Sequence, residues 1–143
     1  MNAKNCHGTI PSSIGRLEYL EQLYLFNNFL TGTIPEQLGN LKRLTHLSLG
    51  KNLLEGTIPA TLGGMHELRY MYIFANSITG NIPSSLGSLV NLFDLGLWDN
   101  KLVGPIPNEL GKLKKMRYFA INGNSLAGPL PSTMFHELVE VSS

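Results

Sequence analysis

The sequence contains little cysteine, little charge and no long hydrophobic run, and each shortage excludes a class of protein. Cys6 is the only cysteine in 143 residues, which rules out an internal disulfide and a multi-cysteine metal site. Only 15% of the residues are charged, and 11 basic against 10 acidic side chains leave a net charge of +1. This balance argues against nucleic-acid binding and against a polybasic membrane anchor.

Hydrophobic residues nevertheless make up 43% of the chain, which is enough for a folded core. No apolar run approaches the roughly 18 residues that a membrane-spanning helix needs. The first residues, Met1 to Gly8, are polar, and no apolar signal-peptide core follows them. We therefore expect a folded chain that has neither a membrane span nor a secretory signal of its own.

Glycine and proline are plentiful, and they recur with one fixed sequence period. Asparagine recurs with the same period, which is the spacing between Asn28 and Asn52. Blocks of this length follow the pattern LxxLxxLxLxxNxLxGxIPxxLGx and begin at Leu17, Leu41, Met65, Leu89 and Leu113. The recurring polar and turn-forming positions are Asn28, Asn52, Asn76, Asn100 and Asn124; Gly32, Gly56, Gly80, Gly104 and Gly128; Gly39, Gly63, Gly87 and Gly111; and Pro35, Pro59, Pro83, Pro107 and Pro131. A fixed period without insertions predicts a stack of similar structural units.

The first block shows what each part of the pattern does. The alternation around Leu23 and Leu25 predicts a short strand with two inward side chains. Asn28 follows where the chain turns, and its side-chain amide can bond backbone groups that the turn leaves unpaired. Gly32 permits a backbone angle that other residues avoid, and Pro35 holds an extended return. One block therefore predicts one coil, with a strand on one side and a tight return on the other.

The return has room for about one helical turn, which we expect Gly39 to end. A single coil cannot bury its leucines, but stacked coils can, and their strands then form a parallel sheet. The predicted organisation is a partial N-terminal repeat over 1–16, five repeats over 17–136, and a degenerate cap or a truncated next repeat over 137–143. Cys6 stands where other blocks have Leu or Ile, so we expect it to be a small buried hydrophobic residue.

The half-pattern LxGxIPxxLG, as it stands from Leu54 to Gly63, resembles the plant-type leucine-rich repeat, and the resemblance runs from Gly8 to about Phe135. It implies an α/β solenoid, a right-handed superhelix with short parallel strands on the concave face and irregular or short helical returns on the convex face. In the family such repeats form the ectodomains of receptor-like kinases and receptor-like proteins, and also secreted inhibitors of wall-degrading enzymes. Their concave faces bind peptides, proteins or small hormones.

The chain departs from that family pattern in lacking cysteine-paired caps and a membrane span. We interpret it either as a fragment of a longer array or as a minimal repeat protein. A fragment of a receptor-type chain would be extracellular or at the cell surface, whereas a complete chain would be cytoplasmic.

The period also sorts the side chains that flank the strand leucines, and these side chains should line the concave face in four columns. The columns are Gln22, His46, Tyr70, Asp94 and Tyr118; Tyr24, Ser48, Tyr72, Gly96 and Ala120; Phe26, Gly50, Phe74, Trp98 and Asn122; and Asn27, Lys51, Ala75, Asp99 and Gly123. The predicted ligand-binding residues are the aromatic members and the two acidic members of these columns: Tyr24, Phe26, Tyr70, Tyr72, Phe74, Trp98, Tyr118, Asp94 and Asp99.

Exposed aromatic clusters are typical of recognition surfaces. The alternative for the aromatic residues is cross-strand stacking that only stabilises the sheet. The two acidic side chains could bind a basic group of a ligand or simply be solvated. We also expect a shallow depression at Ser48 and Gly50, between two aromatic ridges.

The sequence offers no nucleophile beside a base, no phosphate-binding loop and no cluster of histidines, so it predicts neither an enzyme, nor a cofactor, nor a metal site. It favours a non-catalytic module that binds a peptide or protein ligand in recognition or signalling. An inhibitor of a secreted hydrolase and an intracellular scaffold are the alternatives. Because solenoid ends need polar caps, the uncapped ends also predict self-association.

Overall fold

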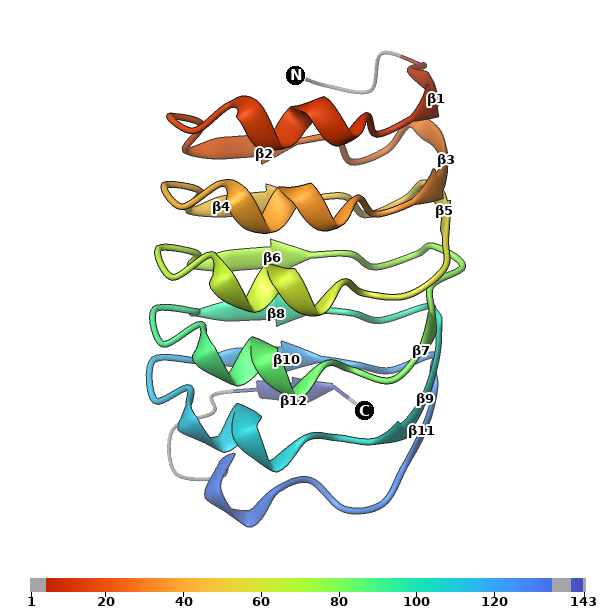
Figure 1. Cartoon of the computed structure of the whole chain (residues 1–143). Coiled ribbons are helices and arrows are strands. Elements are labelled where there is room, and N and C mark those ends of the chain that lie inside the picture. Colours follow the sequence, from red (N-terminus) through yellow and green to blue (C-terminus); the bar gives the residue numbers. More distant parts are fainter. Residues whose placement is uncertain (1–4, 135–139, 143) are drawn as a thin grey trace.

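The computed structural model describes residues 5–134 and 140–142 and shows a stack of coils (Figure 1). One side of the stack is a six-stranded parallel sheet in the order β12-β10-β8-β6-β4-β2. Its strands are β2 (Gln22–Tyr24), β4 (His46–Ser48), β6 (Tyr70–Tyr72), β8 (Asp94–Gly96), β10 (Tyr118–Ala120) and β12 (Glu140–Ser142). From β2 to β10 every strand pairs with the next between equivalent positions of the repeat, so the sequence period is the coil period.

The sixth strand departs from this period. In β12, Glu140 lies opposite Tyr118, where a full period would place Ser142. The strand nevertheless extends the sheet beyond β10. Residues 137–139 and 143 of the predicted cap lie outside the described residues.

A second side of the stack carries short strands that the sequence analysis did not predict. They are β1 (His7–Thr9), β3 (Phe29–Thr33), β5 (Leu53–Glu55), β7 (Thr79–Gly80), β9 (Lys101–Pro105) and β11 (Ser125–Ala127). They pair in parallel as β1-β3-β5 and as β7-β9-β11. Paired residues in these strands are separated by fewer residues than one repeat, since Gly32 lies opposite Leu54 and not opposite its equivalent, Gly56. Strands form here because the residues between the asparagine and the proline of each repeat run extended past the next coil.

The third side consists of short 3-10 helices: η1 (Ser12–Arg16), η2 (Glu36–Asn40), η3 (Ala60–Gly64), η4 (Ser84–Ser88), η5 (Asn108–Lys112) and η6 (Ser132–Met134). An extended proline precedes each of η1 to η5, as Pro35 does with φ −70° and ψ 133°. The proline carbonyl then accepts the first helical hydrogen bond, which in η2 comes from the Leu38 N–H at 3.1 Å.

The expected role of Gly39 as a helix stop is wrong, because Gly39 lies inside η2. A side chain at this column would collide with the next coil: a Cβ on Gly39 would overlap the Thr61 carbonyl, and one on Gly63 would overlap that of Ser85. The glycines therefore let neighbouring helices pack closely. Gly64 differs, since the nearest atom to a Cβ there would be the end of the flexible Lys42 side chain, at 2.8 Å.

Leucine-type side chains of all three sides fill one continuous core, in which residues such as Leu47, Met71 and Leu95 are fully buried. The turns between the strands behave as predicted. Gly32 has a positive φ of +74°. Asn76 accepts the Leu54 N–H at 3.0 Å and donates to the carbonyls of Leu49 and Ile73 at 3.1 and 3.0 Å. This pattern of one accepted and several donated bonds recurs at Asn52, Asn100 and Asn124.

The expectation that Cys6 is buried is wrong: its side chain is exposed. Cys6 belongs to the outermost coil, where its backbone bonds to Asn28 and Phe29 but no described coil covers its outer side. In the described part of the chain we find no helix with the length and apolar character needed to cross a bilayer.

Candidate functional site

The candidate site is the outer face of the six-stranded sheet, which we call the sheet face. The strand register confirms the first two predicted columns, because Tyr70 lies between His46 and Asp94, and Tyr72 lies between Ser48 and Gly96. In β2, β6 and β10 the central residue is the most buried of the three, so it points toward the core and its neighbours point outward. Of the predicted binding residues, Tyr24, Phe26, Tyr118 and Asp99 are exposed, and Tyr70, Tyr72, Phe74, Asp94 and Trp98 are half-buried.

A row of aromatic rings crosses the sheet face from strand to strand. Tyr24, His46 and Tyr70 follow one another with ring centroids 6.1 and 4.6 Å apart, and the second pair is stacked. Phe93 continues the row, 6.0 Å from Tyr70 and 6.2 Å from Tyr118. The structure therefore links Tyr24, Tyr70 and Tyr118 through two rings that were not predicted as binding residues.

Phe93 was not predicted as a binding residue, because it precedes its strand and lies outside the four columns. The signal that could have revealed it is a large apolar side chain at a position where the other blocks have Glu21, Thr45, Arg69 and Arg117. His46 was placed on the sheet face but was not predicted as a binding residue.

A second aromatic feature lies at the strand exits. The rings of Phe74 and Trp98 are stacked, with centroids 4.0 Å apart and planes within 7°. The Phe74 ring lies directly over Gly50, and the Trp98 ring over Gly96, so that a Cβ on either glycine would collide with the ring above it. The predicted depression does not form at Gly50, because the Phe74 ring from the next coil covers this glycine. Ser48 is also buried.

Tyr72 and Asp94 form the polar centre of the face. The Tyr72 hydroxyl donates to Asp94 Oδ2 at 2.6 Å. Burial, and then the bond to Asp94, raise the pKa of the Tyr72 phenol well above its usual range. Burial also raises the pKa of Asp94, while the hydrogen bond from Tyr72 acts in the opposite direction. This carboxylate is thus already engaged by the protein.

Asp99 lies in a different setting from Asp94. It is exposed at the strand exit, and its backbone is left-handed with φ 52°. The whole fourth column shares this conformation, since Asn27, Lys51, Ala75 and Gly123 also have positive φ. Asp99 therefore presents a solvent-exposed carboxylate directly after Trp98 in the chain.

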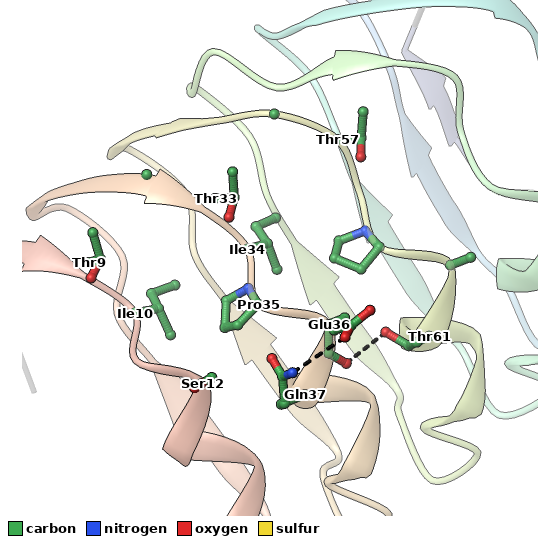
Figure 2. Close-up of a pocket in the computed structure, with 14 residues that line it drawn as sticks. Thr9, Ile10, Ser12, Thr33, Ile34, Pro35, Glu36, Gln37, Thr57 and Thr61 are labelled. Atoms are coloured by element: carbon green, nitrogen blue, oxygen red, sulfur yellow. Dashed lines mark hydrogen bonds between the residues drawn. The ribbon is translucent and has the colours of Figure 1, made fainter.

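A groove on another part of the surface was not predicted. It has a volume of about 970 Å³ and crosses the first three coils where the second strand side meets the 3-10 helices (Figure 2). Thr9, Thr33 and Thr57 line it from successive coils, with Ile34 and Pro35 between them (Figure 2). Within residues 5–134 and 140–142, no three side chains of the metal-ligating types come together.

Comparison with known proteins gives the family. The leucine-rich repeat family model matches residues 18–78. The ectodomain of the receptor kinase SOBIR1 from Arabidopsis thaliana is 34% identical, with a TM-score of 0.83, and the match covers 90% of this chain and 70% of that one. The chain belongs to the plant-type leucine-rich repeat family. No curated protein gave a significant match.

Two longer leucine-rich repeat proteins are also similar. The ectodomain of the Arabidopsis receptor kinase HAESA, in complex with an N-terminally extended IDA peptide hormone, is 41% identical with a TM-score of 0.88. PEPR1, in complex with AtPEP1, is 39% identical with a TM-score of 0.87. The matches cover 92% and 89% of this chain but only 22% and 18% of those chains. The matched parts are repeat ectodomains, so this chain is a repeat domain and not a catalytic domain.

Proposed function

We propose that this leucine-rich repeat domain is a recognition module that binds an extended peptide or a protein loop on the sheet face and serves in signalling. The observation that carries the proposal is the gathering of the aromatic row and the Phe74–Trp98 stack on one face. The similarity to HAESA and PEPR1, which were solved in complex with IDA and AtPEP1, supports a peptide as the ligand.

The binding residues that we propose are Tyr24, Phe26, Tyr70, Tyr72, Phe74, Asp94, Trp98, Asp99 and Tyr118. The half-buried rings of Tyr70, Tyr72, Phe74 and Trp98 would form the centre, since partly buried aromatic side chains are already ordered and lose little entropy on binding. At a strand spacing of about 4.8 Å the sheet is roughly 20–25 Å wide, which accommodates about six or seven extended residues.

The two carboxylates have different roles in this proposal. Asp94 accepts a hydrogen bond from the Tyr72 hydroxyl and so holds that ring in place. Asp99 is exposed and follows Trp98 directly in the chain, with its Oδ1 over Gly123 of the next coil, and its charge favours a ligand in which Lys or Arg stands next to an apolar residue.

The test is a peptide-library screen against the wild-type domain and a Tyr72→Ala, Trp98→Ala double variant. Because Trp98 is the only tryptophan, its fluorescence reports directly on occupation of the site in the wild type. Loss of a hot-spot side chain costs about 2 kcal/mol or more, so we expect at least a roughly 30-fold weaker Kd for the double variant.

The matched control is Tyr19→Ala, which removes an aromatic side chain that is 75% exposed, packs on Arg43 and lies outside the four predicted columns. This control should bind like the wild type. If the double variant keeps its circular dichroism spectrum and still binds every selected peptide, the aromatic groups serve only the sheet and the proposal is wrong.

A further inference from the structure

The aromatic row on the sheet face includes a histidine whose hydrogen bonds fix which ring nitrogen carries the hydrogen. The Thr45 hydroxyl lies 2.8 Å from His46 Nδ1 and 2.9 Å from the carbonyl oxygen of Glu21. Because a carbonyl oxygen only accepts, the hydroxyl donates its single proton to Glu21 and can only accept from the imidazole. His46 Nδ1 is therefore the donor, and in the neutral ring Nε2 is left as an acceptor.

The Nε2 atom of His46 is open to solvent. Within residues 5–134 and 140–142 it has no hydrogen-bond partner, and no side-chain nitrogen or oxygen there is both buried and unpaired. The ring itself is half-buried, with the Tyr24 and Tyr70 centroids 6.1 and 4.6 Å away. Ring contacts and the Thr45 bond thus hold one accessible acceptor in a fixed position within the aromatic row.

The imidazole can change its charge while the groups around it keep theirs. Histidine takes up its second ring proton between about pH 8 and pH 5. The titratable groups beside His46 on the neighbouring coils are Glu21 and Tyr24 on the β2 side and Arg69 and Tyr70 on the β6 side. Phenols stay neutral in this range, whereas carboxylates and guanidinium groups stay charged, and the two exposed ions have opposite signs. One strand further, Asp94 lies opposite Tyr70 and accepts from Tyr72.

We propose that His46 is a binding residue of the sheet face, that its Nε2 accepts a hydrogen bond from an N–H or O–H group of the peptide, and that acidification abolishes this contact. The proposal rests on the function proposed above and adds one contact and a pH dependence to it. In the protonated ring, Nε2 meets the donor of the peptide with a hydrogen and a positive charge. Nδ1 carries its hydrogen in both forms, so the bond to Thr45 still holds the ring.

The first test needs no peptide. Nitrogen NMR of the free domain at pH 8 should show the hydrogen of the His46 ring on Nδ1. The matched reference is His66, an exposed histidine outside the four columns whose ring has no hydrogen bond within the described residues, and it should show a mixture of both tautomers. A His46 ring with its hydrogen on Nε2 overturns the proposal whatever the domain binds.

The second test uses a peptide that the library screen selects at pH 8, with blocked ends and without His, Asp or Glu, so that the peptide itself does not titrate. Its Kd for the wild type should rise at least about tenfold from pH 8 to pH 5, because an unpaired donor at the contact weakens binding. At pH 8 the peptide should also shift the Nε2 signal of His46.

Two variants assign the pH dependence to one ring. His46→Phe keeps an aromatic side chain in the row, and its Kd should stay nearly constant between pH 8 and pH 5. His66→Phe is the matched control and should behave like the wild type. Circular dichroism at both pH values checks that the variants are folded, and the tautomer and the Nε2 shift of the wild type test the contact without any variant.

The outcomes separate this proposal from the function on which it rests. A selected peptide that binds equally at both pH values, or more tightly at pH 5, overturns the role of His46 and leaves the recognition module intact. An undiminished pH dependence in His46→Phe also overturns that role and assigns the effect to another group, such as Asp94. A screen that selects no peptide overturns both proposals.

Discussion

Replacing Asn76 with Ala tests the idea that the asparagine column holds the stack together. The Asn76 side chain accepts the Leu54 N–H at 3.0 Å and donates to the carbonyls of Leu49, Ile73 and Phe74 at 3.1, 3.0 and 3.1 Å. The substitution removes all of these bonds. The free-energy cost differs between the partners, because some of them also accept hydrogen bonds from other donors.

The carbonyls that accept from Asn76 keep a second donor. Leu49 also accepts from Asn52, Ile73 from Asn100, and Phe74 from the N–H of Lys51. The N–H of Leu54, a residue that is 0% exposed, loses its side-chain acceptor. An orphaned buried donor costs about 1–3 kcal/mol, and the weakened carbonyls add about 1 kcal/mol more. On that basis Asn76→Ala should lower the free energy of unfolding by about 2–4 kcal/mol.

Urea unfolding followed by circular dichroism measures this loss, and amide hydrogen exchange should show that the Leu54 N–H loses protection first. The matched control is Asn81→Ala, because Asn81 is an exposed asparagine further along the same coil. A surface substitution of this kind should change stability by less than about 0.5 kcal/mol. If Asn76→Ala is as mild as the control, the asparagine bonds contribute nothing measurable and the reasoning is refuted.

The remaining predictions concern packing, backbone strain and ionisation. Gly63→Ala should destabilise the stack by about 1–3 kcal/mol through overpacking, whereas Gly64→Ala should cost much less; equal urea midpoints would contradict the close-approach argument. Ala75→Gly should raise stability by up to about 1 kcal/mol, since glycine relieves the left-handed backbone at φ 51°, and a loss of stability would contradict this. Because the folded state raises the pKa of Tyr72, it keeps a proton that the unfolded chain releases above pH 10.0, so stability should fall as the pH rises past that value. Asp94→Asn removes the neighbouring charge and should reduce that alkaline fall in the urea midpoint; an unchanged fall would show that Asp94 has no part in it.

The fold could be predicted from the sequence because the repeat leaves few alternatives. A spacing that is kept without insertions from Leu17 onward forces each coil to pack on a copy of itself, and the register of β2 to β10 follows it. The roles of Asn76 and Gly32 were also predictable, since each depends on local backbone geometry that the residue type itself favours.

The candidate site was only partly predictable. Residues such as Tyr70 and Asp94 could be assigned to the sheet face, because side chains alternate along a strand. Their partners could not, because a ring or a hydroxyl reaches across coils to a degree that depends on rotamers and on the size of its neighbours. Thus the Tyr72–Asp94 bond, the place of Phe93 in the aromatic row and the covering of Gly50 by Phe74 emerged only from the packed structure.

The solenoid, its period and the side chains that face outward follow from spacing and residue type alone. How closely each coil contacts the next depends on the packed structure. It placed Gly39 against the next helix, paired the second set of strands in a register shorter than the period, and left Cys6 exposed at the end of the stack. Burial and close contact depend on the distance between two adjacent coils. A column of identical residues says neither how closely neighbouring coils approach nor which described coil lies at an end.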